Sequence, residues 1–276
     1  MNCRRRIAFA ALFCSLTTFV SAQLQHSVSR ISHGVLLEDL TWDQAEKELT
    51  PQRVVVIALG AESKEHGHHL RLNNDWLMAE YFKRRVLEAS DVVIAPTINY
   101  SFYPAFTEYP GSTTLRLETA RDMIVDIVRS LAHYGPKKFY LLNTGVSTAK
   151  PLKQAQEELA KDGIDMRYTD LSRFDDIENK VRKSGGTHAD EIETSMMLYI
   201  APDSVNMKNA ERDLHENKPG GLTRDPNKPG TYSPTGAWGD PTLATKEEGK
   251  IVVEREVAAI LKEIDDLRHA PAKPAQ

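Results

Sequence analysis

Four short apolar runs alternate with segments of helical periodicity, and this alternation limits the fold more than any other feature. The runs occupy residues 54–59, 91–96, 138–142 and 164–168. Apolar residues recur at helical spacing in three longer segments, residues 75–89, 119–134 and 245–268. Another helix is expected up to Asp162, with Ser147 or Thr148 as its N-cap. The pattern predicts an α/β fold with a mostly parallel sheet covered by helices on both faces.

The first 22 residues have the composition of a signal peptide. Three arginines precede an apolar stretch, residues 7–20, and small residues lead to Ala22. We therefore expect cleavage after Ala22 and a periplasmic or secreted location. An uncleaved anchor is the alternative. Both cysteines, Cys3 and Cys14, lie in this segment, so the mature chain would have neither a disulfide nor a thiol nucleophile.

Length and charge limit the partners of the mature chain. Residues 23–269 suit a single α/β domain, and residues 270–276 are expected to form a disordered tail. Three of the 35 basic residues fall in the signal peptide, which leaves 32 against 39 acidic residues. Such an acidic chain is a poor match for nucleic acid, and no second membrane-spanning apolar segment follows. We expect neither nucleic acid nor a membrane as a partner after cleavage.

A histidine-rich loop follows the first apolar run. It spans residues 60–75 and contains His66, His68 and His69 with carboxylates on either side. The loop leaves the carboxyl end of a predicted strand, where open α/β sheets place their ligand sites. Imidazole and carboxylate groups together suit zinc or manganese. A solvated polar loop is an equally weighted alternative.

A second polar stretch spans residues 185–198. If a helix begins near Ala189, His188 stands at its entrance and Glu193 faces inward among apolar residues. These two side chains could complete a metal site or form an acid–base pair. The alternative is an acidic first turn that complements the helix dipole, which accounts for Asp190 and Glu191 better than for Glu193.

Aromatic residues gather in the loop at residues 97–114. They are Tyr100, Phe102, Tyr103, Phe106 and Tyr109. They could wall a substrate pocket, but burial of the loop or an oligomer contact is equally compatible with the pattern. Tyr109 and Trp238 are candidates for contact with a flat or cyclic ligand.

Five stretches together resemble the creatininase (creatinine amidohydrolase) family. They are Glu-His-Gly-His-His-Leu (65–70) with Asp75, Tyr-Pro-Gly-Ser (109–112), Leu-Asn (142–143), His-Ala-Asp-Glu-Ile-Glu-Thr-Ser (188–195) and Trp-Gly-Asp-Pro-Thr-Leu-Ala (238–244). They occur in the family's order and span most of the mature chain. The resemblance implies a three-layer α/β/α domain, assembly as a homo-oligomer, commonly a hexamer, and hydrolysis of C–N bonds, often cyclic, in a small-molecule substrate.

The resemblance also implies roles for particular residues. His66 and Asp75 match ligands of a dinuclear zinc or manganese site, in which Asp75 is the usual bridging carboxylate. His188 matches a histidine that moves protons, and Glu193 matches a general base that is a ligand in some members. Glu65 is a candidate ligand in place of a shifted family position. His69, with Tyr109 and Trp238, is a candidate substrate-binding residue.

Three positions depart from the family pattern. Lys64 stands where the family usually has a ligand glutamate, Gly145 where it has a ligand histidine, and Arg71 where it has a proline. The favoured interpretation is an exported metal-dependent amidohydrolase with an altered, mononuclear or dinuclear, site. The alternative is a non-catalytic protein that binds a small molecule or a partner through the same cleft. Hydrolysis by Ser147 lacks the Gly-x-Ser-x-Gly elbow and is disfavoured.

Overall fold

The computed structural model describes residues 33–274. The predicted signal peptide lies outside the described residues, so its cleavage and the domain start at residue 23 stay predictions. Residues 270–274 of the predicted tail form neither helix nor strand. Within the described part of the chain, no helix combines the length and the apolar composition needed to cross a bilayer.

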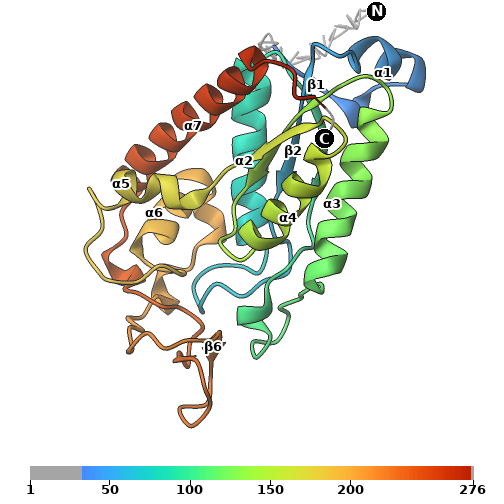
Figure 1. Ribbon diagram of the computed structural model, residues 1–276. Helices are drawn as coiled ribbons and strands as arrows, with labels where there is room; N and C mark the ends of the chain where they lie inside the picture. The colour runs from blue at the N-terminus through green and yellow to red at the C-terminus, as the bar shows by residue number, and fades with distance from the viewer. Residues whose placement is uncertain (1–32, 275–276) are drawn as a thin grey trace, which may run out of the picture. The chain divides into compact units, whose positions relative to one another are not determined.

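The centre of the fold is a parallel sheet with the strand order β1-β3-β2-β4-β5 (Figure 1). Its strands are β1 Val35–Leu36, β2 Val54–Leu59, β3 Val93–Ile98, β4 Lys138–Asn143 and β5 Asp165–Tyr168. The four predicted runs become β2 to β5, and β1 adds an edge strand that the sequence patterns did not indicate. The predicted α/β class is confirmed.

Strand β3 begins and ends two residues later than the predicted run 91–96. Val93 pairs with Val55 and Ile98 pairs with Leu59, but the register shifts between these two points. Pro96 lies in this irregular part. Because proline has no amide hydrogen to donate, it is tolerated where a strand is irregular, and the strand continues past it.

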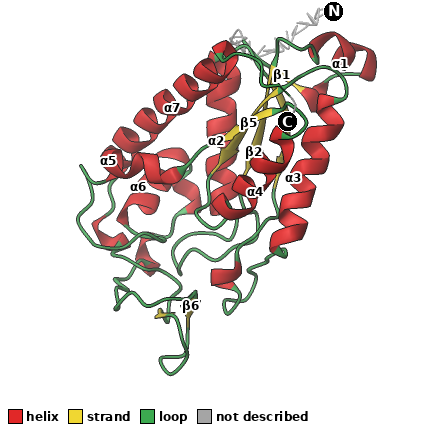
Figure 2. Ribbon diagram, in the orientation of Figure 1, coloured by secondary structure: helices red, strands yellow, loops and turns green. Residues whose placement is uncertain are grey.

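Helices cover both faces of the sheet in three layers (Figure 2). Their bounds are α2 Asn74–Ala89, α3 Leu117–Ala132, α4 Ala149–Ala160, α6 Glu191–Ile200 and α7 Lys246–His269. Val54 and Val56 of β2 pack into the core beneath α2, α6 and α7. Val55 and Ile57 pack into the opposite core beneath α3 and α4. Successive side chains of a strand point to opposite faces, so one continuous apolar run supplies both cores.

Shorter elements complete the described chain. They are α1 Trp42–Glu48, α5 Asp175–Glu178 and the paired strands β6 Leu222–Thr223 and β7 Thr231–Tyr232. Strands β6 and β7 lie in the Pro/Gly-rich segment between α6 and α7 and belong to a separate two-stranded sheet.

Thr148, one of the two predicted candidates, is the N-cap residue of α4, but its side chain makes no capping hydrogen bond. Its hydroxyl donates instead to the Asn143 side chain and to the Gly145 carbonyl. Asn143 also donates to that carbonyl, with a donor–acceptor distance of 2.8 Å. These bonds fix the turn that leaves β4.

The segments with the predicted site residues meet at the carboxyl edge of the sheet. The Trp76 amide donates to the Ala61 carbonyl (3.0 Å) and thereby holds the start of α2 against the end of β2. The Thr113 amide donates to the Ser63 carbonyl (2.9 Å), so the aromatic loop runs beside the histidine-rich loop. His188 and Trp238 form an isolated antiparallel bridge.

Candidate active site

Asp75 forms the centre of a buried charge network. One of its oxygens, Oδ1, lies 2.7 Å from Nε2 of His66, and the other, Oδ2, lies 2.7 Å from the Lys64 ammonium. The side chains of all three residues are at least 95% buried. Burial alone would raise the pKa of Asp75, but the charges of Lys64 and His66 outweigh it and hold this pKa well below its usual range.

The Lys64 ammonium is also enclosed by aromatic rings. It lies 4.7 Å from the ring centroid of Phe106 and 5.5 Å from that of Tyr103. Both faces are within the range of a cation–π contact. Burial, followed by the Asp75 charge, raises the pKa of the Tyr103 hydroxyl. Tyr103, Phe106 and Tyr109 are buried, which favours burial of the aromatic loop over an exposed substrate wall for these three residues.

His188 lies next to both His66 and Phe106. Its ring centroid is 5.1 Å from that of His66 and 4.6 Å from that of Phe106. Its Nε2 lies 3.0 Å from Oε1 of Glu65. Burial acts to lower the pKa of His188, but the Glu65 carboxylate raises it overall. The second oxygen of Glu65, Oε2, is buried without a hydrogen-bond partner among the described residues.

Gly236 allows the close packing around Glu65. Its φ of +93° is the left-handed region, and an added Cβ would lie 2.6 Å from the Glu65 carboxyl carbon. A side chain at Gly236 would therefore displace Glu65 from His188.

Glu193 extends from the first turn of α6 toward His188. Its Oε2 accepts a hydrogen bond from the Ala189 amide and lies 3.8 Å from Nδ1 of His188. The side chain is 22% exposed and lines a cavity, so it faces inward without being fully buried. The helix begins near Ala189, as predicted: Asp190 is the N-cap of α6, and it accepts from the amides of Ile192 and Glu193. Ala189, with a φ of 45°, lies just outside the helix.

The donor group that best suits a metal ion consists of His66, His188 and Glu193. One ligand atom from each lies within 4.8 Å of the others. Ligands of one tetrahedral zinc ion are about 3.4 Å apart for bonds of about 2.0–2.1 Å, so a modest closure would enclose an ion. Two imidazoles and a carboxylate with an open fourth position match a catalytic zinc set.

His66 must exchange a partner if it is to bind that ion. Its Nδ1 lies 3.0 Å from the Lys64 carbonyl oxygen, and its Nε2 faces Asp75. A metal-bound histidine commonly donates its other ring N–H to a carbonyl or carboxylate, and both kinds of acceptor are present here. The residues therefore fit one divalent ion, with the remaining partner of His66 fixing its ring.

The structure thus brings together two of the four predicted ligands, His66 and Glu193, and adds His188. Glu65 and Asp75 contact members of this group instead of belonging to it. For Asp75 the reason is Lys64, since the Lys64 ammonium neutralises the Asp75 oxygen that faces away from His66.

The three candidate substrate-binding residues have protein partners. His69 Nε2 lies 2.8 Å from the Thr194 hydroxyl, the Tyr109 hydroxyl donates to the Ser233 carbonyl (2.7 Å), and the Trp238 indole donates to the His215 carbonyl (3.0 Å). None of the three lines the cavity beside Glu193.

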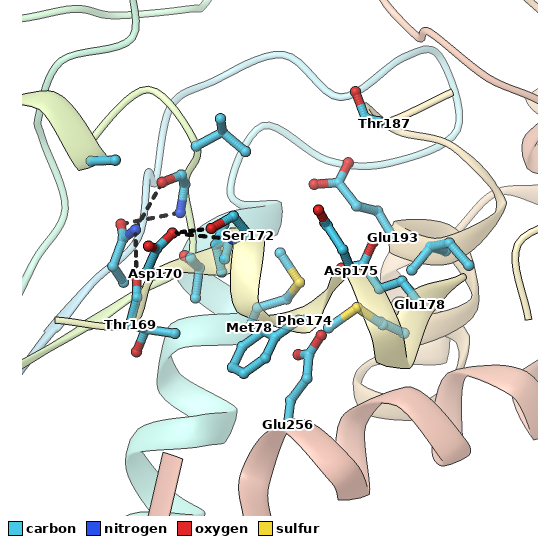
Figure 3. A pocket seen from close by; sticks show the side chains of 18 of the residues that line it. Met78, Thr169, Asp170, Ser172, Phe174, Asp175, Glu178, Thr187, Glu193 and Glu256 are labelled. Carbon is cyan, nitrogen blue, oxygen red and sulfur yellow. Dashed lines mark hydrogen bonds between the residues drawn. The ribbon is translucent and has the colours of Figure 1, made fainter. Parts of the chain in front are cut away.

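That cavity has a volume of about 330 Å³ and contains residues that the sequence patterns did not single out. Glu178 of α5 and Glu256 of α7 line it together with Glu193 (Figure 3). A signal for Glu256 exists in the sequence, because it interrupts the apolar face of α7 between Val252 and Ile260. The signal for Glu178 is weak, since α5 is a single turn.

His69 is expected to make stability depend on pH. Burial lowers its pKa to about 4, whereas an unfolded histidine titrates near about 6.5. Between these values the unfolded chain binds more protons, so the free energy of unfolding falls as the pH falls. From pH 6.5 to 5.0 the loss is about 2 kcal/mol, because each pKa unit is worth about 1.4 kcal/mol.

Urea denaturation at pH 7.0 and 5.0, with chelator present, measures this effect. In His69→Gln, the difference in the free energy of unfolding between the two pH values should be about 2 kcal/mol smaller than in the wild type. The same pH dependence in both proteins would contradict a neutral, buried His69.

Comparison with known proteins connects this site to a family. The family model for creatininase, described as creatinine amidohydrolase, matches residues 38–264. The creatinine amidohydrolase of Pseudomonas putida is 25% identical over 250 residues, which cover 81% of this chain and 94% of that protein. The mycofactocin precursor peptide peptidase of Mycobacterium tuberculosis is 27% identical over 214 residues, which cover 71% of this chain and 78% of that protein.

Solved structures have a similar fold. The shared part is most of the chain: a crystal structure of creatinine amidohydrolase (creatininase) has a TM-score of 0.71 at 23% identity and covers 86% of this chain and 99% of its own. A manganese form of creatininase, covering 86% of this chain and 100% of its own at 23% identity, has a TM-score of 0.68. The family model covers most of the chain, and the predicted resemblance is confirmed. The chain therefore belongs to the creatininase family of hydrolases, in which the two relatives named above act on carbon–nitrogen bonds.

Proposed function

We propose that this chain is an exported metal-dependent amidohydrolase that cleaves a C–N bond of a small molecule, with cyclic amides as the first class to test. A single divalent ion, zinc or manganese, is held by His66, His188 and Glu193. The observation that carries the proposal is the convergence of these three donors at the carboxyl edge of the sheet.

Two features favour one ion over two. The Lys64 ammonium already supplies a positive charge to Asp75, 2.7 Å from its outer oxygen. Beside it, Gly145 offers no ligand, and an added Cβ there would lie 3.3 Å from the Tyr103 ring and 3.1 Å from the Thr148 hydroxyl. Lys64 and Gly145 therefore supply no ligand for a second ion, and other protein groups fill the space beside them.

The side chains around the donor group suit proton transfer. A bound divalent ion would supply Lewis-acid chemistry. The Glu193 carboxylate is only partly exposed and lies at the edge of the cavity, so it can accept a proton from an attacking water and pass it to the leaving nitrogen. Glu65, whose Oε1 lies 3.0 Å from Nε2 of His188, would orient the His188 ring so that its other nitrogen can bind the ion.

Relatives support this reaction class without fixing the substrate. By name, one relative acts on creatinine and another on a precursor peptide, and both reactions concern C–N bonds. Solved creatininases include a manganese form and a Zn-Zn form. The proposed export rests on the sequence of residues 1–22. We also propose that the protein is a homo-oligomer, as the family resemblance implies.

Elemental analysis of the purified protein in chelator-free buffer tests the metal site. We expect about one zinc or manganese ion per chain, lost in His66→Ala and in Glu193→Gln because each removes one of three donors. His68→Ala is the matched control, since His68 is 57% exposed, pairs with Glu211 and lies outside the donor group.

Two ions per chain would overturn the single-ion site. No ion after incubation with excess zinc or manganese would overturn the metal-dependent mechanism and leave a binding protein as the better description. Ring opening of creatinine and other cyclic amides, measured as formation of the ring-opened acid, is expected to require His66 and Glu193 but not His68.

A further inference from the structure

The cavity beside Glu193 combines an apolar interior with an acidic wall. It is bounded by the end of β4 and by α2, α5, α6 and α7. Its apolar lining includes Met78, Phe82, Phe174, Met196 and Ile260. A volume of about 330 Å³ lies at the lower end of the range of small-molecule sites, which favours a compact ligand.

Glu256 is the most unusual group in this cavity. It is 3% exposed, yet it has no hydrogen-bond or ion-pair partner among the described residues. Figure 3 shows its carboxyl group directed away from α7 and into the cavity. Burial, followed by the charge of Glu178, raises the pKa of Glu256 well above its usual range. A buried carboxyl group without a partner is costly, so its position indicates a partner that comes from outside the chain.

The charges around Glu256 define the sign of that partner. Six acidic residues line the cavity: Asp170, Asp175, Glu178, Asp190, Glu193 and Glu256. The basic residue in the same lining, Arg182, is already paired with Glu178 and with Asp190. Anions would meet uncompensated carboxylates here, whereas a cation would relieve them.

We propose that this cavity binds a positively charged amine or amidine group of the substrate, with Glu256 as its ion-pair partner. Only the position of the scissile bond in this proposal rests on the proposed hydrolase function. Glu193 belongs both to the cavity wall and to the metal-donor group. A substrate anchored at Glu256 therefore extends toward the donor group and presents a C–N bond there.

Binding of two isosteric probes to the full chain in chelator-containing buffer tests the proposal. Benzamidinium carries the positive charge, and benzamide is its neutral counterpart. Isothermal titration calorimetry should show that benzamidinium binds at least about tenfold more tightly than benzamide. The variant Glu256→Gln should lose most of that preference while its benzamide affinity stays unchanged.

The matched control is Glu247→Gln. Glu247 lies on α7 as well, and the substitution makes the same change of charge, but Glu247 is exposed and outside the cavity. It should keep the wild-type preference. If Glu256→Gln does not fold, Glu178→Gln, which removes a neighbouring acid, is expected to weaken benzamidinium binding as well.

Equal affinity of the wild type for the two probes would overturn the cation site, and so would an unchanged preference in Glu256→Gln. Because the measurement needs neither metal nor catalysis, its result is independent of the metal analysis. A chain that binds no metal but selects benzamidinium would retain the cation site and lose the hydrolase. A chain that binds one ion without selecting benzamidinium would retain the metal site of the hydrolase and lose the cation site.

Discussion

Lys64→Met is expected to lower the free energy of unfolding by about 3–5 kcal/mol, as is typical when one partner of a buried ion pair is removed. The substitution retains most of the apolar stem of Lys64 and deletes its ammonium. Asp75, which is fully buried, would lose the charge that lies 2.7 Å from its Oδ2. Urea denaturation at pH 7 with chelator measures the change.

Lys161→Met is a matched control for this substitution. Lys161 is 62% exposed and pairs with Glu158 on the surface, so its loss should cost less than about 1 kcal/mol. The double variant Lys64→Met/Asp75→Asn should be more stable than Lys64→Met alone, because no unpaired buried charge remains. Similar losses in Lys64→Met and Lys161→Met would show that the buried pair has no special role.

Gly60→Ala is expected to destabilise the protein by about 3 kcal/mol or more, the upper part of the range for overpacked cores. An added Cβ would lie 2.3 Å from the Asp75 carbonyl oxygen and 2.7 Å from Cβ of Ala79. Both atoms belong to α2, so relief requires that the helix moves away from β2. Such a shift would also disturb the Trp76–Ala61 bond that holds the start of α2.

The control for Gly60→Ala is Gly185→Ala, since an added Cβ at Gly185 has no neighbour within 4 Å. Its stability should change by less than about 0.5 kcal/mol. Thermal or urea denaturation of the two variants gives the comparison. A loss at Gly60 no larger than at Gly185 would mean that α2 tolerates displacement from the sheet.

The layered fold was predictable because its signals are local. The run 54–59 is apolar throughout, and the structure places a strand at Val54–Leu59. The predicted helix at 75–89 differs from α2 by one residue at its start. In contrast, β1 is only two residues long and its pairing with β3 depends on the completed sheet, so no sequence periodicity predicts it.

The site was predictable in part for the same reason. His66, Asp75, His188 and Glu193 stand in short dense motifs, and the fold brings them together. The partner of Lys64 was not predictable, because an ion pair across eleven residues depends on how the loop closes on α2. The pairing of His188 with Glu65 was not predictable either, because these residues are 123 positions apart in the chain.

Lys64 has a further consequence for how this protein meets its surroundings. A positive charge attached to the chain is present in every copy from synthesis onward, and no chelator or shortage of metal can remove it. The charge balance of Asp75 is therefore independent of the metal supply. We expect a chain built in this way to keep its fold when metal is withdrawn, so scarcity would switch off a metal-dependent reaction without destroying the protein.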